Sequence, residues 1–149
     1  MDVEIEVLQK VTGEVVEAFG RLLPQLSTSA RPLDADALTV IAGAESNSVL
    51  IARVGGEIVG TLTLVIFAIP TGVRAWIEDV IVDEAARGQE FGGKRVGEAL
   101  TAEAIAIARD AGAKTVDLTT RPSRVAAGKL YERLGFVQRD SRVYRYSPS

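Results

Sequence analysis

The residues best suited to chemistry lie in two segments of the second half of the chain. The first joins an apolar stretch, Trp76 to Val82 (W-I-E-D-V-I-V), to a glycine-rich loop, Arg87 to Gly97 (R-G-Q-E-F-G-G-K-R-V-G). The second, Leu130 to Phe136, reads L-Y-E-R-L-G-F and carries Tyr131. A carboxylate, a cationic glycine loop and a phenol are groups that can hold an anion and transfer protons.

The glycine-rich loop leads into a long helical pattern. Glycines allow backbone N–H groups to converge, and a helix start adds free donors and a positive dipole, so phosphate binding is one interpretation. Arg87, Lys94 and Arg95 add positive charge to the same loop. The other interpretation is an ordinary junction whose glycines only make turns. The loop matches neither a P-loop nor a G-x-G-x-x-G fingerprint.

Two residue types are missing from the chain, which has no cysteine and no histidine. Thiolate nucleophiles, disulfides, histidine-based triads and Cys or His metal sites are therefore excluded. No D-x-D-x-D-G calcium loop occurs, although a site for a hard cation built on carboxylates stays possible. With 17 basic and 20 acidic side chains, the formal net charge of −3 also argues against a nucleic-acid partner.

The length of 149 residues and the element pattern predict one domain, residues 1–149, of the α/β class. Thr12, Asp34 and Ser123 are the expected N-caps of three helices, and Pro24 is an expected helix stop. About seven strands in a mixed sheet, with about four helices on both faces, follow from the order β-α-α-β-β-β-α-β-α-β-β. The expected strands are residues 3–7, 49–54, 57–69, 73–82, 115–119, 136–137 and 142–146.

Neither an export signal nor a membrane span is predicted. Met1 to Lys10 alternates acidic and apolar residues and lacks a basic start followed by an apolar core. The longest uncharged run, Ile58 to Val73, is shorter than the about 18–20 residues of a spanning helix and contains glycine and proline. We therefore expect a cytoplasmic protein with no membrane partner.

Together, the acidic strand, the glycine loop, the helix ending at A-R-D-A-G (Ala108 to Gly112) and the L-Y-E-R-L-G-F segment resemble the Gcn5-related N-acetyltransferase superfamily. The resemblance covers Val49 to Tyr146 well and the first third mainly by element order. It implies the acyl-CoA N-acyltransferase fold, acetyl-CoA as acyl donor, no metal, and an amine that attacks the thioester directly. Homodimers are common in the superfamily, and the sequence leaves the oligomeric state open.

The resemblance also implies roles for individual residues. Tyr131 falls on the tyrosine that protonates the departing thiolate, and Glu78 on the position of a carboxylate base. Because side chains alternate along a strand, we expect the neighbouring Asp79 to point to the opposite face. From the residues alone, a tyrosine on a mostly apolar helix is more often an amphipathic packing residue, and Glu78 is alternatively a solvated carboxylate or a partner of Arg74. Thr119, where some relatives place a glutamate, cannot act as a base.

For the cofactor, the resemblance implies pairing of the pantetheine arm with the strand before the loop, and an oxyanion contact from an N–H near Val80. The loop departs from the family pattern: Gly92 to Gly97 fits best, with Arg95 in place of the central glycine, and Arg87-Gly88 is displaced by about five residues. Arg124 stands where the family has asparagine. The expected cofactor-binding residues are Val80, Ile81, Val82, Arg87, Gly88, Gly92, Gly93, Lys94, Arg95, Val96, Gly97 and Arg124.

The main function hypothesis is therefore an acetyl-CoA-dependent N-acetyltransferase acting on a primary amine that the sequence does not identify. A non-catalytic acyl-CoA-binding or regulatory domain on the same fold is the alternative, because the loop is altered. A nucleotide-binding α/β protein is a third, weakened by the absence of repeated β-α-β order. Residues 24–44 and 138–146 are the expected determinants of acceptor choice.

Overall fold

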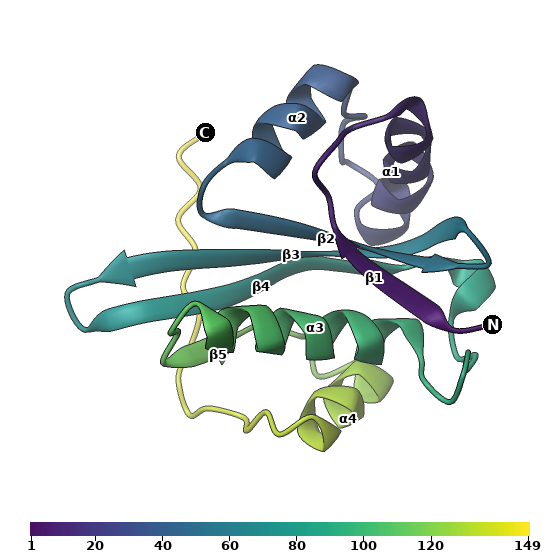
Figure 1. Ribbon diagram of the computed structural model, residues 1–149. Coiled ribbons are helices and arrows are strands. Elements are labelled where there is room, and N and C mark those ends of the chain that lie inside the picture. Colours follow the sequence, from purple (N-terminus) through teal and green to yellow (C-terminus); the bar gives the residue numbers. More distant parts are fainter. The chain divides into compact units, whose positions relative to one another are not determined.

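The structure is a computed structural model that describes residues 1–149. The chain divides into two compact units, Met1–Thr119 and Thr120–Ser149. The first unit contains the β-sheet and the helices α1, α2 and α3, and the second contains α4 and the C-terminal tail (Figure 1).

The sheet of the first unit has five strands in the spatial order β1-β2-β3-β4-β5. The first four strands are antiparallel neighbours, whereas β5 runs parallel to β4. The parallel pairing covers only Arg74–Trp76 of β4, so residues 77–82 have a strand partner on one side only. The strands are β1 (Val3–Val7), β2 (Asn47–Val54), β3 (Glu57–Ile69), β4 (Gly72–Val82) and β5 (Thr115–Asp117).

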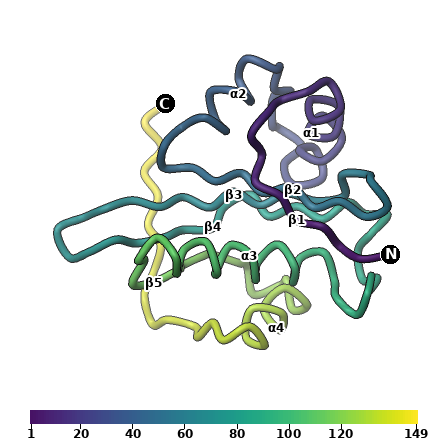
Figure 2. The backbone as a smooth tube through the Cα atoms, in the orientation of Figure 1, coloured from purple at the N-terminus to yellow at the C-terminus, as the bar shows by residue number.

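Three helices of the first unit cover the two faces of this sheet. α1 (Gly13–Leu26) and α2 (Ala35–Gly43) lie on one face, and α3 (Val96–Asp110) lies on the other (Figure 1). Thr12 and Asp34 cap α1 and α2 by accepting the N–H three residues on, at 3.4 and 2.8 Å, which confirms both predicted caps. Figure 2 shows the backbone leaving β4, passing through the glycine-rich loop and returning along the sheet as α3.

Apolar side chains are buried on both faces of the sheet. Leu22 of α1, Leu38 of α2 and Ile81 of β4 belong to one cluster beneath the first two helices. On α3, Leu100 and Ala104 are fully buried. The strand that carries the candidate site is therefore fixed by packing from both sides. None of the helices combines the length and apolar character that crossing a membrane requires.

The predicted strand count is wrong, because the structure has five strands and not about seven. Residues 136–137 and 142–146 form no strand. Isolated strand-forming segments need a partner edge and a buried face to fix their register. Val137, Val143, Tyr144 and Tyr146 are instead strongly exposed, so their side chains provide no such face.

Two predicted helix boundaries also need correction. Pro24 lies inside α1, which continues to Leu26, because a proline near the helix end breaks only one backbone hydrogen bond before the chain leaves the helix. The N-cap of α4 (Val125–Arg133) is Arg124 and not Ser123, and no side chain caps this helix.

Candidate active site

A β-bulge interrupts the pairing of β4 with β3. Thr63 pairs with Glu78 and Thr61 with Ile81, so two residues of β4, Asp79 and Val80, stand opposite one residue of β3. Asp79 has φ of 50°, the only positive φ outside glycine in the chain. A bulge redirects a strand and changes where its side chains and N–H groups point. The prediction that Asp79 points to the face opposite Glu78 assumes that side chains alternate regularly along the strand. The bulge interrupts that alternation at Asp79.

Beyond the bulge, the backbone of Val82 points to the free edge of the sheet. The N–H of the next residue, Asp83, donates to the carbonyl of Val59 on β3 at 2.8 Å. Because backbone groups alternate in direction along a strand, those of Val82 face away from β3. Val80 and Val82 are half-buried and Ile81 is buried. The backbone of Val82, one of the predicted pantetheine-binding residues, therefore lies on an edge of β4 that has no strand partner.

Arg87 folds back onto this edge. Its Nε donates to the Val82 carbonyl at 2.8 Å, and one of its terminal nitrogens donates to Oε1 of Gln25 at 3.4 Å. The same Gln25 oxygen accepts the N–H of Glu84 at 3.0 Å. The Arg87 guanidinium is therefore bound to the end of β4 and to α1.

A second arginine ties α1 to the end of β4. Arg21 donates to the Asp83 carboxylate at 3.1 Å and to the Ile58 carbonyl at 2.8 Å. Burial raises the pKa of Asp83, but hydrogen bonds from the Ala85 N–H and Arg21 outweigh it and hold that pKa below its ordinary value. The sequence did not predict this contact, because no pattern along the chain links α1 to Asp83, which is more than 50 positions away.

The loop before α3 contains a short hairpin. Phe91 and Lys94 exchange backbone hydrogen bonds at 2.8 and 3.2 Å around Gly92-Gly93, whose φ values are 62° and 82°. Positive φ at both turn positions is what a two-residue hairpin turn requires, and glycine adopts it without strain. The Lys94 N–H is thereby used, and the Asp2 carboxylate packs against Gly92.

The free donors of this region lie at the start of α3. Arg95 is the N-cap and makes no side-chain cap bond, and the first helical hydrogen bond runs from Ala99 to the Arg95 carbonyl. The N–H groups of Val96, Gly97 and Glu98 therefore have no acceptor within the helix. The predicted anion-binding segment is Gly92 to Gly97. In the structure, the N–H groups free to bind an anion are those of the residues at the start of α3.

Close packing holds this helix start beside the end of β4. A side chain at Gly60 of β3 would bring its Cβ within 2.9 Å of Val96 Cγ1 and 3.0 Å of the Ile81 carbonyl oxygen. Only glycine leaves room for this approach. The structure therefore brings together the strand edge and the helix N-terminus that the sequence placed in one site.

The side chain of Glu78 is exposed and makes no hydrogen bond or ion pair within the protein. The predicted alternative partner, Arg74, instead donates to the hydroxyls of Thr115 and Thr71 at 3.3 and 3.1 Å. Its Nε is buried without a partner. Glu78 thus remains free to interact with a ligand at the bulge.

Tyr131 and Arg124 belong to the second unit. Tyr131 lies on α4, and its ring meets that of Phe136 edge-on, with centroids 5.7 Å apart. Burial raises the pKa of the Tyr131 phenol, and the Arg124 guanidinium offsets part of this shift. The hydroxyl therefore keeps its proton at neutral pH.

An open, bulged strand edge that leads to a bare helix N-terminus defines a site for an extended ligand with an anionic end. Residues 15–136 match the model of the acetyltransferase (GNAT) family, and the chain belongs to this family. No group of three or more acidic, histidine or cysteine side chains is arranged to hold a metal ion.

Solved structures share the fold of this chain. A transcriptional regulator from Bacillus halodurans C-125 is 28% identical with a TM-score of 0.77, over 97% of this chain and 99% of the other. An acetyltransferase from Trypanosoma brucei is also 28% identical, with a TM-score of 0.74 over 98% and 100%. Glucosamine-6-phosphate N-acetyltransferase from Arabidopsis thaliana, 19% identical, shares the fold with a TM-score of 0.76 over 98% and 99%. No curated protein sequence matches the chain.

Proposed function

We propose that the chain is an N-acetyltransferase that transfers the acetyl group of acetyl-CoA to a primary amine by direct attack in a ternary complex. The observation that carries this proposal is the free edge of β4, bulged at Asp79 and Val80, beside the uncapped start of α3. Residues 1–149 would act together as one acetyltransferase domain.

The residues present suit acetyl-CoA, which supplies an activated thioester when bound. Val82 offers its backbone N–H for pairing with the pantetheine arm, whereas its carbonyl is bound by Arg87. The unpaired N–H groups of Val96 and Gly97, with the side chains of Lys94 and Arg95, would hold the pyrophosphate. In this proposal the Val80 N–H would donate to the carbonyl oxygen of the thioester as negative charge develops on that oxygen.

Two side chains would move protons. The amine nitrogen forms a bond to the thioester carbon, and the carbon–sulfur bond breaks with its electron pair on sulfur. Glu78 accepts the proton that the amine loses, directly or through water, and Tyr131 donates a proton to the sulfur. Support for these roles comes from the unpaired Glu78 carboxylate and the protonated Tyr131 phenol.

The second candidate, a non-catalytic acyl-CoA-binding or regulatory domain, is favoured by one observation. The hairpin at Gly92-Gly93 uses the Lys94 N–H and leaves fewer free amides in the loop than the family pattern implies. Isothermal titration with acetyl-CoA, combined with a CoA-release assay across a panel of amines, separates the two. We expect binding with turnover, whereas binding without turnover of any amine would support the second candidate.

A further inference from the structure

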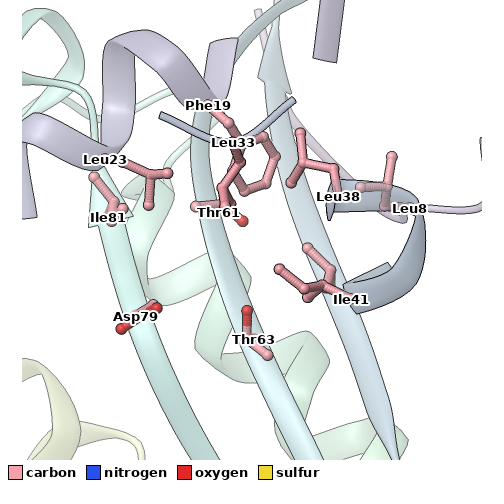
Figure 3. Close-up of a pocket in the computed structure, with 11 residues that line it drawn as sticks. Leu8, Phe19, Leu23, Leu33, Leu38, Ile41, Thr61, Thr63, Asp79 and Ile81 are labelled. Atoms are coloured by element: carbon pink, nitrogen blue, oxygen red, sulfur yellow. The ribbon is translucent and has the colours of Figure 1, made fainter. Parts of the chain in front are cut away.

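A cavity in the first unit lies between the sheet and the helices α1 and α2 (Figure 3). Its volume is about 60 Å³, and eight of its eleven lining residues are aliphatic or aromatic. The apolar wall includes Phe19 and Leu23 from α1, Leu33 from the following loop and Ile41 from α2. Such a lining favours an apolar ligand group, because its burial releases water from apolar surface.

Only three polar side chains line this cavity. The Thr61 hydroxyl is already satisfied, because it donates to the Leu50 carbonyl at 2.8 Å. The side chains of Thr63 and Asp79 make no hydrogen bond within the protein, and no lysine, arginine or histidine is present in the wall. Asp79 is exposed, whereas Thr61 and Ile81 beside it are buried, so the cavity leads inward from one uncompensated carboxylate.

Asp79 lies in the bulge, between the two residues proposed to act in acetyl transfer. Glu78 precedes it and Val80 follows it in β4. A positive φ is uncommon outside glycine, although aspartate adopts it more readily than most residues, and residues with unusual backbone angles cluster at functional sites. The strained residue is therefore the one that joins the cavity to the reaction site.

We propose that the acceptor is a primary amine on a short, unbranched apolar chain, and that Asp79 binds its ammonium group while the chain enters the cavity toward Phe19 and Ile41. This inference rests on the proposed function. A volume of about 60 Å³ is well below the about 150 Å³ of an apolar cavity that holds benzene, so it limits the apolar group to a short aliphatic chain. Asp79 is then a specificity residue, distinct from the base Glu78.

The same features argue against polycationic and strongly hydroxylated acceptors. A second ammonium at the far end of a short chain would lie among leucine, isoleucine and phenylalanine side chains with no counter-charge. A buried, unpaired charge is strongly unfavourable, and a buried hydroxyl without a partner is also unfavourable. Selection should therefore depend on the end of the chain remote from the reacting nitrogen.

The test compares three amines of equal length: n-butylamine, 4-amino-1-butanol and 1,4-diaminobutane. We expect kcat/KM from CoA release to be at least about 10-fold higher for n-butylamine than for 1,4-diaminobutane, because only the latter places a charge in the apolar cavity. The aminobutanol should lie between them. Equal or greater kcat/KM with 1,4-diaminobutane would overturn the inference.

Substitutions test the two ends of the cavity separately. Asp79→Asn removes the charge, and asparagine tolerates the positive φ, so KM for n-butylamine should rise about 10-fold or more with unchanged acetyl-CoA affinity. Glu103→Gln, an exposed carboxylate on α3, is the matched control and should leave KM unchanged. Leu33→Ala should shift the preference from n-butylamine toward n-hexylamine. An unchanged KM in Asp79→Asn would refute the role of Asp79.

Titration of n-butylammonium into the protein without acetyl-CoA makes the inference independent of turnover. We expect binding that Asp79→Asn weakens and that Glu103→Gln does not, even in an enzyme with no measurable activity. Failure of acetyl-CoA to bind, together with Asp79-dependent n-butylammonium binding, would refute the proposed function and retain the cavity assignment. Acetyl-CoA binding without Asp79-dependent amine binding would refute the cavity assignment alone.

Discussion

The guanidinium of Arg87 donates from Nε to the carbonyl of Val82 at 2.8 Å, across the turn that follows β4. This carbonyl faces the free edge of the sheet, where the proposed pantetheine arm would pair. Arg87 therefore occupies, within the chain itself, a hydrogen-bond acceptor that the cofactor would use. We therefore expect Arg87 to contribute less to CoA binding than Arg95, which adjoins the start of α3.

We predict that Arg87→Ala weakens CoA binding by well under about 1 kcal/mol, because this exposed side chain is already bound to Val82 and Gln25. Pantetheine, which has no phosphate, should bind Arg87→Ala at least as tightly as wild type. Lys94→Ala and Arg95→Ala should each weaken CoA binding by about 1–3 kcal/mol through loss of a charge-assisted contact. Calorimetric titration of the three variants checks this order. Dominance of Arg87 would show that it binds the phosphates.

Tyr131→Phe should lower turnover by about 10- to 1,000-fold, the scale expected for loss of one general acid, with nearly unchanged acetyl-CoA affinity. The ring contact with Phe136 is retained, so folding should be preserved. Because burial raises the pKa of Tyr131, wild-type activity should not fall through its ionisation below about pH 10. Steady-state rates between pH 6 and 10 check both points, and wild-type turnover in the variant would exclude Tyr131 from the mechanism.

Glu78→Gln should lower the rate most on the acidic side of the pH profile, where more of the acceptor is protonated. The substitution keeps the size of a side chain that has no partner in the protein, so the free energy of unfolding should hardly change. The pH dependence of kcat/KM is the measurement. A profile identical to that of wild type would place the base elsewhere.

Asp83→Asn should destabilise the fold at neutral pH by about 1 kcal/mol, since the half-exposed contact with Arg21 loses its charge. The folded-state pKa of Asp83 is lowered, so its stabilisation is complete above the unfolded pKa of about 3.9 and is lost as the pH falls through the folded pKa. Urea unfolding of both proteins at pH 7 and near pH 3 should show the difference shrinking. A constant difference would contradict an ionic contribution.

Gly60→Ala should destabilise the protein by about 1–3 kcal/mol, because the new methyl group would press against Val96 and the Ile81 carbonyl. Displacement of the α3 start should also weaken CoA binding. Gly20→Ala is the control, because Gly20 lies in α1 with open space around it. This variant should be more stable than the wild type by about 0.5–1 kcal/mol. Denaturant unfolding of both variants, with CoA titration of Gly60→Ala, measures these effects.

Much of the fold could be predicted because the signals are local. The capping side chains of Thr12 and Asp34, and the glycine turn between β2 and β3, act over a few residues, and all appear where the sequence placed them. The order of strand, glycine loop and helix also predicted which segments would form the site. The resemblance then identified the family that the match over residues 15–136 confirms.

The remaining features depend on contacts between distant parts of the chain. The bulge at Asp79 is defined by register against β3, the Arg87 position by a carbonyl at the end of β4, and the cavity by two helices packed on three strands. In the C-terminal tail, strand propensity at Val143 and Tyr144 predicted a strand that the structure does not form. The sequence alone determined caps, turns and periodicity, because these are short-range. Tertiary packing decided register, strand pairing and side-chain environment, because backbone groups and cavity walls need partners that only the folded chain supplies.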